Sequence, residues 1–81
     1  MTMTEMLKAT FDRREKLQSE DPKRKIWACG KTFEIDGVGK VFCVIEIAQG
    51  AQTFMRPHFR RRWKLNGKRI SADKLAKIVG A

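Results

Sequence analysis

Residues 56–71 form the stretch with the clearest chemistry, because sixteen residues carry seven positive side chains and no negative one. Arginine supplies most of this charge, and its planar guanidinium group can hold a phosphate through two hydrogen bonds at once. A solvated basic face that discourages aggregation is the alternative, but one or two edge lysines would suffice for that purpose. We therefore expect an anion-binding surface that comprises Arg56, Arg60, Arg61, Arg62, Lys64, Lys68 and Arg69.

Three aromatic residues accompany these cations: Phe54, Phe59 and Trp63. Aromatic rings beside basic side chains can stack on unpaired bases, at about 1–3 kcal/mol per base. In a strand, however, Phe59 and Trp63 fall on the side that should face the core. Packing is therefore the first interpretation of these two rings, and base stacking is the alternative.

The residues that usually perform catalysis or bind metal ions are few and scattered. Two cysteines and one histidine are too few for a four-ligand zinc site, and no C-x-x-C pair or glycine-rich phosphate loop exists. Cys29 and Cys43 lie in apolar segments where a thiol should be inert. His58 beside Pro57 is expected to be a surface or hydrogen-bonding residue rather than a ligand. We therefore expect a protein that is not an enzyme and that has no cofactor and no metal.

Length and charge are consistent with a single small basic domain over residues 1–81. The net charge is +9, and it is unevenly distributed: residues 1–22 hold four basic and five acidic side chains, whereas the other 59 residues hold fourteen basic and four acidic ones. A protein with this excess of positive charge favours acidic partners. The sequence shows no signal peptide and no membrane span, and its basic cluster is not on an amphipathic helix, so we expect a cytoplasmic protein that does not bind membranes.

The first 22 residues are predicted to form an amphipathic helix over 3–19, preceded by a capping box of Thr2 and Glu5 and stopped by Pro22. Its core-facing stripe is predicted to contain Met3, Met6, Leu7, Thr10, Phe11 and Leu17.

Residues 26–70 are predicted to form an antiparallel sheet. The first hairpin pairs 26–35 with 40–48 across the turn 36–39, and it places four residues on one face: Trp27, Cys29, Phe33 and Ile35. The register expected from that turn puts Cys29 and Cys43 on opposite faces, so a disulfide between them is not expected.

The second half of the sheet follows a turn at 49–52. A third strand is predicted to start at Thr53, to be interrupted near Pro57 and to end at Leu65, before an Asn66-Gly67 turn and a short strand over 68–70. This register sets Trp63 opposite Ile70 and Lys64 opposite Arg69, and it places Arg60, Arg62 and Lys64 on one face.

Residues 71–80 are predicted to form the final helix, capped by Ser71, with Asp73 in the first turn, Lys77 in the last turn and Gly80 at its end. Its buried stripe is expected to be Leu75, Ile78 and Val79. The resulting fold class is α+β: an N-terminal helix, a three- to four-stranded antiparallel sheet and a C-terminal helix.

Two functions are compatible with these features. The first is a nucleic-acid-binding module, for DNA or RNA, that holds the phosphate backbone through the arginine- and lysine-rich ribbon. The second is a small interaction protein, such as a phage-type accessory inhibitor or regulator, that docks its basic face on an acidic surface of a larger protein, including one of the nucleic-acid machinery. The sequence leaves open whether the protein is a monomer or a dimer.

Overall fold

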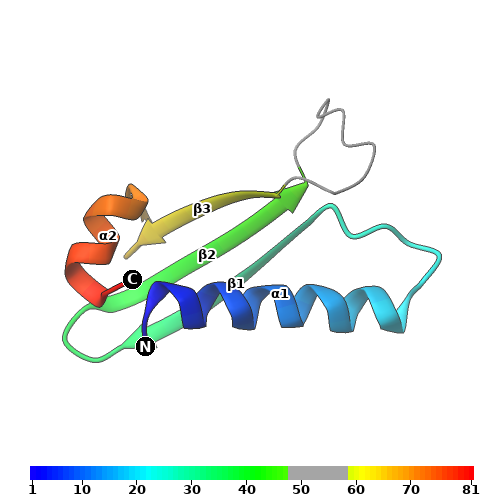
Figure 1. Ribbon diagram of the computed structural model, residues 1–81, viewed down its shortest axis with the longest axis horizontal. Helices are drawn as coiled ribbons and strands as arrows, with labels where there is room; N and C mark the ends of the chain where they lie inside the picture. The colour runs from blue at the N-terminus through cyan, green and yellow to red at the C-terminus, as the bar shows by residue number, and fades with distance from the viewer. Residues whose placement is uncertain (48–58) are drawn as a thin grey trace.

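The computed structural model describes residues 1–47 and 59–81 (Figure 1). The elements are α1 (Met3–Glu20), β1 (Ala28–Ile35), β2 (Gly39–Ile47), β3 (Phe59–Leu65), β4 (Lys68–Arg69) and α2 (Ala72–Val79). The strands form one antiparallel sheet in the order β1-β2-β3-β4. The predicted α+β fold is therefore confirmed. The expected turn at 49–52 and the expected start of the third strand lie outside the described residues.

The core lies between the two helices and one face of the sheet. It contains Met3 and Met6 from α1, Leu75 from α2 and four residues that the strands direct toward them: Phe33, Val41, Cys43 and Trp63. Both helices thus cover the same side of the sheet, and no described element packs on the other side. We call this other side the open face.

The first helix begins with the predicted capping box. Thr2 Oγ1 accepts a hydrogen bond from Glu5 N (3.3 Å), and Glu5 Oε1 accepts one from Thr2 N (3.0 Å). The carbonyl oxygens of Gly80 and Ala81 accept further bonds from the N–H groups of Met3 and Thr4, so α1 starts beside the end of α2. These contacts satisfy backbone donors that the first turn leaves without a helical partner.

Two expected core residues of the helices lie at the surface instead. Leu17 is 37% exposed and Ile78 is 49% exposed, whereas Leu75 is fully buried. The prediction was wrong at Leu17 and Ile78, since helical spacing identifies a stripe but not how far the sheet extends beneath it. Among the described residues, no helix is sufficiently long and apolar to cross a membrane.

The first strand starts two residues later than predicted, because α1 binds the preceding segment. Gln18 Oε1 accepts a hydrogen bond from Ile26 N (2.9 Å), and Arg14 Nε donates to the carbonyl of Ile26 (3.2 Å). Trp27 then lies at the end of the sheet, 52% exposed, with Lys25 Nζ 4.5 Å from its ring centroid. Trp27 therefore lies outside β1, exposed beyond the start of the strand that carries Cys29.

The register of the first hairpin also corrects a prediction. Cys29 pairs with Ile45 and Lys31 pairs with Cys43, so both cysteines lie on the helix-covered face and both are buried, free thiols. The cause is Gly39, which adopts φ +117° and is the first residue of β2. The loop between the two strands therefore has three residues rather than four. One residue of shift reverses the side of every side chain in a strand.

Candidate nucleic-acid interface

The open face carries cations from β3 and β4. Alternation along β3 directs Trp63 into the core and therefore directs Arg60, Arg62 and Lys64 to the open face. The tight turn at Asn66 (φ 50°) and Gly67 (φ 85°) folds the chain back, so that Arg69 pairs with Lys64 as predicted. We call these four exposed residues the basic face: Arg60, Arg62, Lys64 and Arg69.

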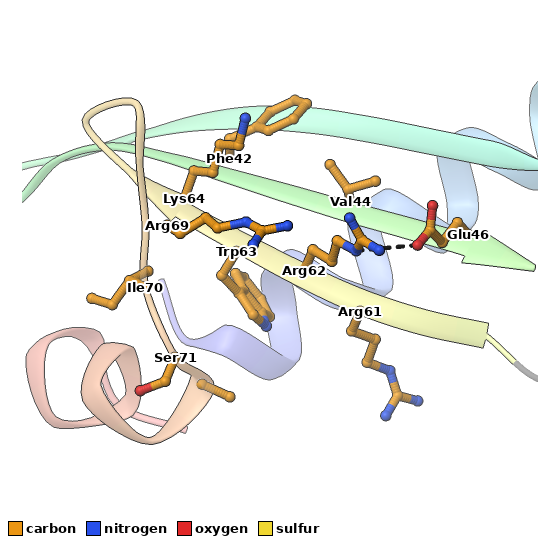
Figure 2. A pocket seen from close by; sticks show the side chains of 11 residues that line it. Phe42, Val44, Glu46, Arg61, Arg62, Trp63, Lys64, Arg69, Ile70 and Ser71 are labelled. Carbon is orange, nitrogen blue, oxygen red and sulfur yellow. Dashed lines mark ion pairs between the residues drawn. The ribbon is translucent and has the colours of Figure 1, made fainter. Parts of the chain in front are cut away.

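Strand β2 supplies the floor beside the basic face. Lys64 pairs with Phe42, Arg62 with Val44 and Arg60 with Glu46. Phe42, Val44 and Glu46 are each half-buried. Together with residues 61–64 of β3 and residues 69–72 they line a shallow hollow of about 690 Å³ (Figure 2). The hollow thus combines an apolar floor with a cationic border.

Acidic side chains compensate only part of this charge. Within residues 1–47 and 59–81, the ion pairs are Arg62 Nε to Glu46 Oε1 (3.1 Å) and Lys40 Nζ to Glu34 Oε1 (3.9 Å). The remaining members of the basic face have no acidic partner in this described part of the chain. Like charges directly opposite each other in a ladder destabilise it by a few tenths of a kcal/mol or more. The Lys64–Arg69 pair is such a case, and a bound anion would offset its cost.

Two expected binding residues, Arg61 and Lys68, do not join the basic face, and a third lies outside the described residues. Arg61 extends from the other side of β3, although it borders the same hollow at the strand edge (Figure 2). Lys68 pairs with Leu65, so alternation places it on the side opposite to Arg69, where it is exposed. Arg56 lies outside the described residues, as do Phe54 and His58.

Two of the three expected stacking rings, Trp63 and Phe59, pack on the helix-covered side. Trp63 is 5% exposed within the core. Phe59 is half-buried, with its ring edge-on to Phe11 at a centroid distance of 5.2 Å and the guanidinium carbon of Arg14 5.1 Å from its centroid. Neither ring lies on the open face, which agrees with the packing interpretation.

Among the described residues, the aromatic residue of the open face is Phe42, which was not among the residues expected to bind. The run 41–47 is apolar at almost every position, a pattern typical of a strand that is buried on both faces. The usable signal was the pair of charged residues at Lys40 and Glu46, because alternation places them on the same side as Phe42 and Val44.

Other chemistry of the described residues is limited. No group of three or more histidine, cysteine, aspartate or glutamate residues in 1–47 and 59–81 is arranged to hold a metal ion. Burial raises the pKa of the Cys43 thiol, an effect that Thr10 and Arg61 oppose. Comparisons with protein-family models, curated proteins and solved structures find no match to this chain.

Proposed function

We propose that this protein is a non-enzymatic nucleic-acid-binding module that holds the phosphate backbone on the open face of its sheet. The observation that carries the proposal is the row of Arg60, Arg62 and Lys64 beside Arg69, which only Glu46 partly neutralises among the described residues. Phosphates would supply the missing negative charge, and arginine would contact them through bidentate hydrogen bonds.

The dimensions of the row suit a nucleic-acid strand. Alternate residues of a strand are about 7 Å apart, so the side chains from Arg60 to Lys64 start from points spread over about 14 Å. Measured along the helix axis, one strand of B-form DNA places about four phosphates within that length. Such contacts give affinity without sequence preference, because the backbone is the same for every base.

Binding to mixed-sequence duplex DNA, single-stranded DNA and RNA at about 50 mM and about 200 mM salt tests this proposal, since counterion release weakens such binding steeply between these concentrations. Salt-sensitive binding to any of the three supports it. No binding at the lower salt concentration would contradict it and would favour docking on an acidic protein surface, which a pull-down from nuclease-treated lysate would then examine.

A further inference from the structure

Phe42 is an aromatic residue beside the basic face. It lies on the central strand β2, between its cross-strand partners Thr32 on β1 and Lys64 on β3. Its side chain is half-buried although no described helix or strand covers this face. Figure 2 shows the ring on the same side of the sheet as the side chains of Lys64 and Arg69. An apolar ring therefore lines the same hollow as two cations that have no acidic partner in the described residues.

Gly30 determines how this ring lies. A Cβ atom added at Gly30 would be 2.6 Å from Phe42 Cζ and 2.9 Å from Cε2, so the ring extends over the glycine backbone of β1. Any larger residue at this position would displace the ring. The absence of a side chain at position 30 thus lets Phe42 lie against the sheet, which covers part of the ring and leaves the rest accessible from the open face.

We infer that the basic face binds a single strand, with one base stacked on Phe42 and the adjacent phosphates on Lys64 and Arg69. This inference rests on the proposed function and adds the ligand class to it. A base in an intact duplex is already stacked and paired, so it cannot reach a ring that lies against a sheet. An unpaired base can do so, and stacking on aromatic rings beside a positively charged surface is how proteins hold single strands without sequence preference.

The test compares a fluorescent single-stranded 12-mer with its duplex by anisotropy, for the unmodified protein and for Phe42→Leu. We expect Phe42→Leu to weaken single-strand binding about fivefold or more, the lower end of the effect of losing one stacked base. Duplex binding should change less than twofold. Phe59→Leu is the matched control, because the same substitution on the helix-covered side should leave binding to both probes unchanged.

Three further measurements do not depend on how well Phe42→Leu folds. Phe42→Tyr keeps the ring and should bind the single strand within about twofold of the unmodified protein. A 12-mer of abasic nucleotides has the same phosphates without bases, and the unmodified protein should bind it about fivefold more weakly than the base-containing strand. Gly30→Ala should reproduce the single-strand loss of Phe42→Leu, because it displaces the ring.

The outcomes separate this inference from the proposed function. Equal affinity for abasic and base-containing strands, or equal losses for duplex and single strand in Phe42→Leu, would overturn base stacking while leaving phosphate binding intact. Absence of salt-sensitive binding to every probe would overturn both. DNA and RNA versions of the 12-mer, measured in parallel, show whether the surface prefers single-stranded DNA or single-stranded RNA.

Discussion

Arg62 Nε lies 3.1 Å from Glu46 Oε1 on the open face, so an acid of β2 holds one of the four cations of the basic face. Both side chains are accessible to solvent, at 52% for Arg62 and 29% for Glu46. An exposed pair of this kind contributes at most about 1 kcal/mol to stability. Its larger effect concerns ligands, because Glu46 both repels an approaching phosphate and competes with it for Arg62.

Glu46→Gln should therefore tighten nucleic-acid binding. Release of Arg62 and loss of one negative charge should raise affinity about two- to fivefold at low salt, in line with the energy of an exposed ion pair. Glu15→Gln is the matched control, because it changes net charge equally on the exposed side of α1. Titration of all three proteins with one labelled oligonucleotide checks this. The same increase in both variants would show that net charge alone, and not the pair, determines affinity.

The two hairpins depend on the contact between Gly39 and Asn66. Asn66 Oδ1 accepts a hydrogen bond from Lys40 N (2.9 Å), and a Cβ atom at Gly39 (φ +117°) would collide with the Asn66 amide. Gly39→Ala should lower the free energy of unfolding by about 2–3 kcal/mol through strain and collision together. Gly37→Ala, at φ +78° with open space around it, should lose only about 1 kcal/mol. Urea unfolding measures both, and equal losses would refute a structural role for the contact.

The capping box predicts an acid-dependent loss of stability. Hydrogen bonds from Thr2 to the carboxylate lower the pKa of Glu5 below its ordinary value of 4.5. A lowered pKa stabilises the folded state above pH 4.5, and this contribution disappears as the pH falls through the lowered value. Glu5→Gln should thus lose less stability than the unmodified protein between pH 5 and about pH 3. Urea unfolding of both proteins across this pH range checks this prediction. Equal decreases in the free energy of unfolding would contradict the contribution of Glu5.

Thiol labelling tests the corrected register. Because Cys29 and Cys43 both face the helices, 6% and 0% exposed, both should react far more slowly in the native protein than in urea. Cys43 should be the slower of the two at pH 8, since burial raises its pKa and reduces the reactive thiolate. Time-resolved labelling followed by mass spectrometry assigns each site. Rapid native labelling of Cys43 would place it on the open face and reject the observed register.

Features with a local cause could be predicted from the sequence. The Asn66-Gly67 turn fixes the pairing of Lys64 with Arg69, and alternation then assigns each residue of β3 to a face. Ser71 and Thr2 marked the starts of both helices for the same reason, since a cap is a contact between near neighbours.

Features that depend on distant contacts could not be predicted. The glycine-rich segment 36–39 permits loops of three or four residues, and only the contact of Gly39 with Asn66, 27 positions further along the chain, distinguishes them in the folded protein. The start of β1 was predicted two residues too early because side chains of α1 bind the backbone of Ile26. Phe42 was missed because an apolar run does not show which of its two faces a helix covers.

The salt dependence of nucleic-acid binding by Lys64→Gln/Arg69→Gln tests the central claim most directly. This double variant removes the directly opposed cations of the basic face, and Arg13→Gln/Lys16→Gln removes the same two residue types from the exposed side of α1. The plot of log affinity against log salt should become shallower by about 1.4–1.8 in the first variant, because each lost phosphate contact reduces the slope by about 0.7–0.9. The second variant should retain the slope of the unmodified protein. Equal slopes in all three proteins would contradict phosphate binding on the open face.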